Sequence, residues 1–177
     1  HLDNSYYGRQ YPLYVPPSHL DDLKVKTIIT NRRIMTETEP LTRRIVIFGA
    51  TGDLCKRKLI PALYQLWCKH LLPHNILIVG ASRREISKQC WLEKLGDYPN
   101  EFTDWLDFVS CDLSCPESLM KLHDESADTT YFLSVPPSTY ADAITNLKEG
   151  GFLDDPERSR VVIEKPFGYD YKSANNL

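Results

Sequence analysis

Two short apolar runs constrain the fold of this chain more than any other feature of its sequence. The runs cover Ile45–Phe48 and Ile76–Val79, and neither alternates with polar residues. A strand with one face in water alternates apolar and polar residues, whereas a strand covered by helices on both faces is apolar throughout. The two runs therefore predict central strands of a parallel sheet.

Three further runs complete a pattern in which strands alternate with longer amphipathic stretches. The five expected strands cover residues 44–48, 76–79, 107–111, 130–135 and 160–164. Alternation at this spacing is typical of βαβ units, so we predict a doubly wound α/β fold with a parallel sheet. Residues 43–177 are expected to form this one domain.

Helices are expected between these strands. The first is expected to turn one apolar face to the sheet, made of Leu59, Leu63, Leu66 and Trp67. Pro61 suits the first turn of that helix. Further helices are expected from about Glu85, Pro116 and Ser138, and the last is expected to end at Gly150-Gly151.

The first 42 residues follow a different pattern. They show little periodicity, but they contain Tyr6, Tyr7, Tyr11 and Tyr14, followed by Pro16 and Pro17. We expect residues 1–42 to form an irregular N-terminal arm, either docked on a surface through its aromatic residues or mobile as a chain terminus.

Composition excludes several classes of partner. A net charge of -3 and a pI near 6.0 give no electrostatic reason to bind nucleic acid or an anionic membrane surface. No apolar run approaches the roughly 20 residues that cross a bilayer, and the first residues lack the pattern of a secretory signal. We therefore expect a cytoplasmic protein.

The cysteines predict neither a disulfide framework nor a metal site. There are five of them, they include no C-x-x-C pair, and no histidine lies near them at metal-ligand spacing. We expect reduced cysteines that serve mostly as small packing residues.

The first expected strand leads directly into a glycine loop. Gly49 and Gly52 lie between a buried strand and a helix, where a dinucleotide's pyrophosphate binds in this architecture. Without a Cβ, the backbone can approach the phosphates, and the start of the helix supplies free N–H groups and partial positive charge. The spacing is G-x-x-G rather than the commoner G-x-G-x-x-G, so the place of the loop in the fold carries the interpretation. A glycine turn without a ligand is the alternative.

The end of the second expected strand favours NADP over NAD. An acidic side chain there would bind the ribose 2′-hydroxyl, whereas an arginine would bind a 2′-phosphate. Here Arg83 and Arg84 follow the strand, and the first acid is Glu85. The alternative is a pair of exposed arginines on a loop.

A lysine follows the fifth expected strand. Lys165 lies in the run Glu164-Lys165-Pro166-Phe167-Gly168, at a carboxyl strand end where ligands bind in open parallel sheets. We expect it to direct a cation toward the substrate and the nicotinamide. Without the other motifs, a surface lysine before a turn would be the better interpretation.

Taken together, these motifs closely resemble the glucose-6-phosphate dehydrogenase family. I-F-G-A-T-G-D-L-C-K-R-K resembles its nucleotide-binding loop, V-I-E-K-P-F-G-Y-D its E-K-P-F-G-x-D signature, and S-V-P-P-S-T-Y the stretch before its fourth helix. The resemblance covers about 43–177 and implies a Rossmann-like NADP-binding domain. It also implies that hydride passes from C1 of glucose 6-phosphate to NADP, which opens the oxidative pentose phosphate pathway, in an enzyme that is a homodimer or homotetramer.

The resemblance also implies roles for the residues of the cofactor's adenosine half. Arg83 would hold the 2′-phosphate, and Asp112 with Leu113 would line the adenosine side. The NADP pyrophosphate would be cradled by Gly49, Ala50, Thr51, Gly52, Asp53, Leu54, Cys55 and Lys56.

Three more residues are assigned to the reacting half of the site by the resemblance. Tyr140 and Lys165 would lie by the nicotinamide. Lys165 would be a catalytic residue that also touches the sugar, and Lys58 would help to bind the substrate.

This sequence also departs from the family pattern. The family's substrate-binding run R-I-D-H-Y-L-G-K, its later histidine base and its C-terminal β+α domain are absent, and the three histidines at 70, 74 and 123 stand in no such context. Because oxidation of a hydroxyl needs a base, we expect this chain alone to bind NADP without turnover. Two alternatives stay open, namely a glucose-fructose oxidoreductase type of dehydrogenase and a non-catalytic, truncated NADP-binding module.

Overall fold

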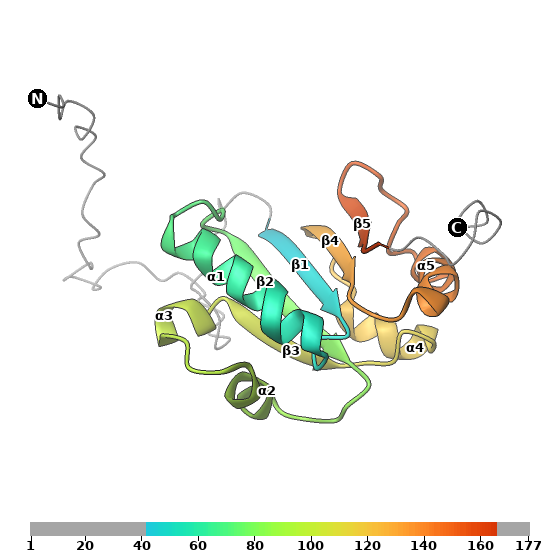
Figure 1. Cartoon of the computed structure of the whole chain (residues 1–177). Helices are drawn as coiled ribbons and strands as arrows, with labels where there is room; N and C mark the ends of the chain where they lie inside the picture. Colours follow the sequence, from blue (N-terminus) through green and yellow to red (C-terminus); the bar gives the residue numbers. More distant parts are fainter. Residues whose placement is uncertain (1–41, 166–177) are drawn as a thin grey trace, which may run out of the picture. The chain divides into compact units, whose positions relative to one another are not determined.

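The described part of the protein is a parallel α/β sheet domain. The computed structural model describes residues 42–165, which belong to one compact unit running from 36 to 177. Within this range the strands are β1 Thr42–Phe48, β2 Ile76–Ser82, β3 Leu106–Ser110, β4 Ala127–Leu133 and β5 Ser159–Ile163 (Figure 1). Their order is β3-β2-β1-β4-β5, and every pair is parallel. The predicted fold class is confirmed, while the N-terminal arm lies outside the described residues except for Thr42.

Helices connect the strands on both faces of the sheet. In chain order they are η1 Cys55–Leu59, α1 Ile60–Cys68, α2 Lys88–Leu95, α3 Asn100–Thr103, α4 Pro116–Leu119, η2 Met120–Leu122, η3 Pro137–Thr139 and α5 Tyr140–Glu149. Among these described helices, none is both long and apolar enough to cross a membrane.

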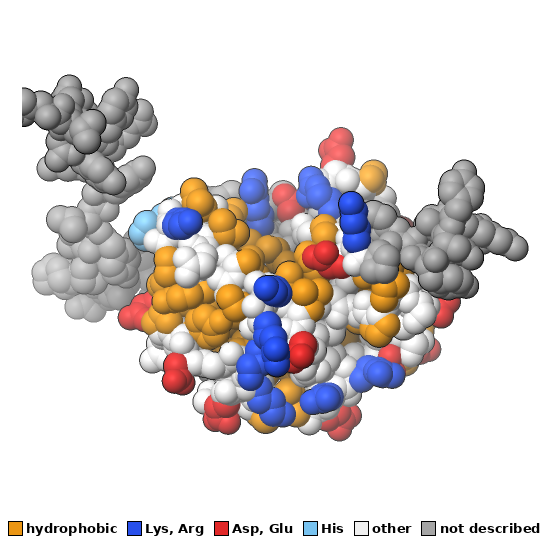
Figure 2. Space-filling view, in the orientation of Figure 1, with side chains coloured by type: hydrophobic (Ala, Val, Ile, Leu, Met, Phe, Trp, Pro, Cys, Tyr) orange, Lys and Arg blue, Asp and Glu red, His pale blue; other side chains and the backbone are white. Residues whose placement is uncertain are grey.

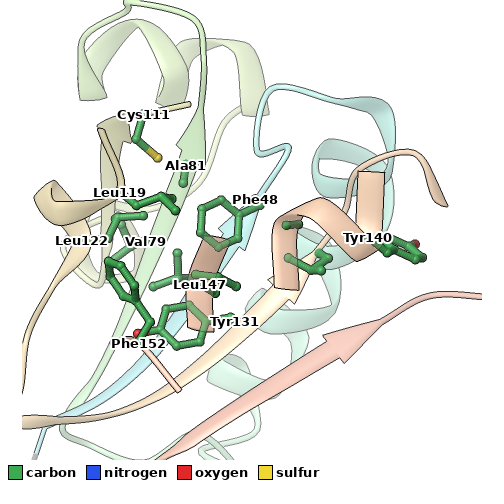
Figure 3. Close-up of a cluster of buried hydrophobic side chains, with 13 residues drawn as sticks. Phe48, Val79, Ala81, Cys111, Leu119, Leu122, Tyr131, Tyr140, Leu147 and Phe152 are labelled. Carbon is green, nitrogen blue, oxygen red and sulfur yellow. The ribbon is translucent and has the colours of Figure 1, made fainter. Parts of the chain in front are cut away.

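The continuous apolar runs bury side chains on both faces of the sheet. In β1, Val46 and Phe48 enter one core while Ile47 enters the other, because successive side chains of a strand point to opposite faces. The first core joins β1, β2 and β4 to α4, η2 and α5. Figure 3 shows Phe48 and Tyr131 of this core beside Leu147. The second core joins the opposite face to α1, α2 and α3.

The observed strand ends differ from the predicted ones by at most three residues, and the end of β1 at Phe48 and the start of β2 at Ile76 agree with the prediction. The largest difference that bears on the site is at β2, which continues to Ser82 instead of ending at residue 79. Gly80 and Ala81 still pair with β1, opposite Ile47 and Phe48, so the ladder extends to the level of the glycine loop.

The helix after β1 begins with an unusual turn. The π-helical turn η1 precedes α1, whose second residue is Pro61, as the sequence suggested. The buried face of α1 was predicted to include Leu66, and this prediction is wrong, because 39% of that side chain is exposed. Trp67 packs on the core. Leu66 comes one residue earlier, so its side chain is rotated by about 100° around the helix axis and lies outside the buried face.

Candidate functional site

The loop after β1 is held against the ends of both neighbouring strands. The N–H groups of Gly49 and Ala50 donate to Ala81 O of β2, over 2.9 and 3.1 Å. On the other side, Ser134 N donates to Phe48 O over 3.0 Å. The strand order reverses at β1, so this loop lies at the switch point where ligands bind in open parallel sheets.

Gly49 cannot be replaced by a larger residue without a shift in the backbone. It has a φ of +79°, which favours glycine, and a Cβ there would overlap Ser134 O. Gly52 closes the turn by donating its N–H to Gly49 O over 2.9 Å. The backbone therefore runs close to the β4 loop before the helix starts.

The turn opens into a helix whose first residues carry several charges. Lys56 and Lys58 are exposed, and Arg57 pairs with Asp53 over 3.7 Å at the surface. Figure 2 shows Lys and Arg side chains gathered on the viewed face around the N-terminal end of this helix. Since a helix start already carries partial positive charge, the region attracts an anion.

A cavity of about 450 Å³ lies between the glycine loop and the carboxyl ends of the strands. Its walls come from four connections, those after β1, β2, β3 and β4. They include Gly49, Thr51, Gly52, Ser82, Arg83, Arg84, Asp112, Leu113, Ser114, Val135 and Thr139. The volume lies in the range of small-molecule and cofactor pockets.

The end of β2 presents two arginines on a backbone that is fixed from two sides. The Arg84 N–H donates to Ser82 Oγ over 3.2 Å, and Ser110 Oγ donates to Arg84 O over 2.9 Å. Both Arg83 and Arg84 are exposed at the cavity wall. The backbone of Arg84 is anchored in this way, and both arginines lie at the cavity wall, where they are available to a phosphate.

An acidic residue, Asp112, lies just after β3 and is close enough to Arg83 to feel its charge. Asp112 Oδ1 accepts hydrogen bonds from Ser114 N at 3.0 Å and from Ser114 Oγ at 2.7 Å. These two bonds, and then the charge of Arg83, lower the pKa of the Asp112 carboxyl below its usual value. Asp112 is therefore ionised at neutral pH, close enough to Arg83 to be felt electrostatically.

The comparison with protein families decides the identity of this domain. The family described as "Glucose-6-phosphate dehydrogenase, NAD binding domain" matches residues 46–177. The chain belongs to the glucose-6-phosphate dehydrogenase family. The part of the family that matches is its NAD binding domain, so a nucleotide is the cofactor class of this domain.

Relatives from distant organisms match the same part of the family. The chain is 34% identical over 145 residues to the glucose-6-phosphate 1-dehydrogenase of Borreliella burgdorferi, which covers 75% of this chain and 30% of that protein. It is 31% identical over 157 residues to the glucose-6-phosphate 1-dehydrogenase of Schizosaccharomyces pombe, and the match covers 75% of this chain and 31% of that protein. The chain therefore spans about 30% of the length of the curated relatives it matches.

Solved structures of the family have the same fold. The glucose-6-phosphate 1-dehydrogenase of Mycobacterium avium superposes with a TM-score of 0.67 at 29% identity, over 76% of this chain and 32% of that one. A glucose-6-phosphate dehydrogenase in complex with its substrate glucose 6-phosphate superposes with a TM-score of 0.65 at 28% identity. This match covers 80% of this chain and 34% of that one.

The structure brings six of the residues expected to bind the cofactor to one cavity. Gly49, Thr51, Gly52, Arg83, Asp112 and Leu113 all line it. Ala50 and Cys55 are buried behind the loop, while Asp53, Leu54 and Lys56 are exposed on the first helical turns. These last five residues do not form the cavity wall.

The residues expected near the nicotinamide and the sugar lie apart from this wall. Tyr140 is 2% exposed, and its hydroxyl donates to Glu164 O over 3.3 Å. Lys165 is exposed just after β5, and Lys58 is exposed on η1. The remainder of the E-K-P-F-G run lies outside the described residues, so the roles of these three side chains stay predictions.

Burial keeps the thiol of Cys55, at the start of η1, protonated. Cys55 has no exposed surface, and burial raises the pKa of its thiol to about 12. Burial likewise raises the pKa of the Cys111 thiol, which belongs to the cavity wall, to about 11. Both are neutral thiols at physiological pH, and within residues 42–165 no cluster of His, Cys, Asp and Glu could hold a metal.

Residues far away in the sequence support these loops, and no sequence motif indicated them. Trp91 of α2 donates its indole N–H to Ala50 O over 2.9 Å, across a separation of 41 positions. Ser82 and Ser110 fix the backbone of Arg84. A helical position for Trp91 was visible in the sequence, but its partner depends on how α2 packs on the sheet.

Proposed function

We propose that this domain binds NADP, in preference to NAD, for a glucose-6-phosphate dehydrogenase. The observation that carries the preference is the end of β2, where Arg83 and Arg84 line the cavity and no acidic residue belongs to the strand end. A ribose 2′-phosphate placed there would meet guanidinium groups, whereas a free 2′-hydroxyl would lack the usual acidic partner.

The residues of the glycine loop fit a pyrophosphate. Gly49 leaves a backbone cradle that a Cβ would fill, and Thr51 and Gly52 line the cavity beside the helix start. The Thr51 N–H makes no hydrogen bond within residues 42–165, so it is available to a phosphate oxygen. Arg83 would then hold the 2′-phosphate, and Leu113 would pack against the adenosine.

The reaction that we propose for the whole protein is oxidation of glucose 6-phosphate at C1. When bound, NADP supplies the acceptor for the hydride that leaves C1 as the lactone forms. In this chain, Lys165 after β5 and Lys58 on η1 would direct positive charge toward the phosphosugar, and Tyr140 would hold the end of β5 in place through Glu164 O. The oligomeric state and the cytoplasmic location stay predictions.

Calorimetry with the full chain tests the cofactor assignment. We expect NADPH to bind more tightly than NADH, and Arg83→Ala to weaken NADPH binding by about 1–3 kcal/mol with little effect on NADH. Arg160→Ala is a matched control, because Arg160 is exposed and bonds Glu157 O away from the cavity. Tighter binding of NADH, or equal losses for both nucleotides, would contradict the proposal.

Activity of the complete protein tests the substrate assignment. We expect turnover with glucose 6-phosphate and NADP, and none with free glucose at the same concentration. Comparable oxidation of free glucose would favour the glucose-fructose oxidoreductase alternative.

A further inference from the structure

Trp91 connects α2 to the glycine loop. Ser87 caps the start of this helix, because its Oγ accepts the Cys90 N–H over 3.1 Å. Trp91 therefore lies in the first turns of α2, and its side chain packs in the core against the sheet. Its side chain is 1% exposed, and its Nε1 donates to Ala50 O over 2.9 Å. A buried indole normally needs an acceptor, and here the acceptor is a backbone carbonyl of the loop.

The indole reaches the loop only because β2 has a glycine at the crossing. A Cβ on Gly80 would lie 2.6 and 2.8 Å from two carbons of the Trp91 ring, and 3.0 Å from the Ala50 Cβ. The ring also packs against Phe108 of β3, with centroids 5.3 Å apart. Gly80 therefore provides the space in which Trp91 and Ala50 meet.

The hydrogen bond fixes the orientation of one peptide group. Ala50 C=O and Thr51 N–H belong to the same planar trans peptide unit, so they point in opposite directions. Trp91 binds the oxygen from the buried side, which directs the Thr51 N–H away from the core. Thr51 lines the cavity, and its N–H has no hydrogen-bond acceptor in the part of the chain that the structure describes.

We propose that Trp91 is a positioning residue for the dinucleotide's pyrophosphate. It holds the Ala50–Thr51 peptide so that the Thr51 N–H is presented to a phosphate oxygen before the ligand arrives. This inference rests on the proposed function, and it adds a residue that acts through the loop without touching the cofactor. Preorganised donors bind more tightly because the cost of ordering them is met on folding.

A pair of ligands separates positioning from general support of the fold. NADPH uses the loop, whereas 2′-AMP has the 2′-phosphate and adenosine but no pyrophosphate. In the full chain, Trp91→Phe keeps an aromatic ring beside Gly80 and removes the donor. We expect it to weaken NADPH binding about 3- to 10-fold, as for one lost hydrogen bond, and to leave 2′-AMP binding unchanged.

Trp67→Phe is the matched control. Trp67 is half-buried and packs on Tyr64 and Phe102, so the same substitution removes an indole away from the loop. We expect it to change neither affinity. Unchanged NADPH binding in Trp91→Phe, or equal losses for NADPH and 2′-AMP, would overturn the positioning role.

A second measurement needs no substitution at Trp91. The chain contains three tryptophans, so its nitrogen-15 spectrum has three indole N–H resonances, two of which are assigned by Trp67→Phe and Trp105→Phe. We expect the Trp91 resonance to shift on addition of NADPH and to stay in place with 2′-AMP. A Trp91 resonance that does not shift at saturating NADPH would overturn this inference alone. Failure of the unaltered chain to bind NADPH would overturn both this inference and the proposed function.

Discussion

Gly49, just after β1, passes so close to Ser134, just after β4, that a Cβ on the glycine would overlap the serine's carbonyl oxygen. The two strands are neighbours in the sheet, but helices on opposite faces follow them. Gly49 and Ser134 therefore meet in the wall of the cavity, at the point where the strand order reverses. Any residue larger than glycine would separate the two loops.

Gly49→Ala is expected to destabilise the protein strongly. A positive φ costs an alanine about 1–3 kcal/mol, and the overlap with Ser134 adds to that cost. Gly96→Ala is the matched control, because Gly96 also has a positive φ, of +123°, but nothing lies within 4 Å of its Cβ position. Urea unfolding should show a larger loss for Gly49→Ala than for Gly96→Ala. Equal losses would mean that the β4 loop moves aside at no cost.

Phe102 is the centre of an aromatic cluster that joins α1 to α3. Its side chain has no exposed surface, and its ring lies 5.1, 5.7 and 5.5 Å from the rings of Tyr64, Trp67 and Tyr98. Phe102→Ala should lower the free energy of unfolding by about 3–5 kcal/mol, because the cavity it leaves is enclosed on all sides. Leu66→Ala, on the exposed side of α1, should cost less than about 1 kcal/mol in the same urea titration. A loss of similar size for both variants would contradict this account.

The central strands and the place of the cavity were predictable from local sequence. The runs Ile45–Phe48 and Ile76–Val79 need no tertiary information, because continuous apolar residues of strand length are buried on both faces in a parallel sheet. The glycine loop follows the first run directly, so its position at the carboxyl edge of the sheet followed as well.

Features that depend on long-range packing could not be predicted. The helix α3 has only four residues, Asn100–Thr103, and it exists because Phe102 enters the core. Leu66 had the right spacing for a buried face, but the centre of that face lies elsewhere on α1. The Trp91–Ala50 hydrogen bond requires both that α2 packs on the sheet and that Gly80 has no side chain. Trp91 and Gly80 are far from Ala50 in the sequence, so no local pattern predicts the bond.

Tyr140→Phe should loosen the end of β5. The Tyr140 hydroxyl donates to Glu164 O from a buried position, and β5 is the outer strand of the described sheet. Loss of this bond should lower the free energy of unfolding by about 1 kcal/mol and speed amide exchange in β5. Tyr98→Phe is the control, because Tyr98 packs through its ring on Phe102. Unchanged exchange in β5 after Tyr140→Phe would show that the hydroxyl does not hold the strand.

Cys55 makes the stability of the domain fall as the pH rises above about 9. Burial raises the pKa of its thiol from 9.0 to about 12 in the folded protein, whereas the unfolded chain keeps the ordinary value. Below pH 9 both states hold the proton, and the stabilisation is fully present. Between pH 9 and 12 the unfolded chain releases a proton that the folded protein retains, so the free energy of unfolding falls by up to about 1.4 kcal/mol per pH unit.

Cys55→Ala should remove this slope. Cys111 and any other group that titrates in this range are common to both proteins and cancel in the difference between them. Urea unfolding under reducing conditions, at intervals from pH 8 to 10.5, should therefore give two curves that converge as the pH rises, because the parent loses stability faster than the variant. Cys68→Ala is the matched control: it removes an exposed thiol instead of a buried one, and the curve of this variant should run parallel to that of the parent. Parallel curves for Cys55→Ala as well would mean that the thiolate finds stabilising partners in the folded loop, and that the buried side of the glycine loop is more polar than its packing indicates.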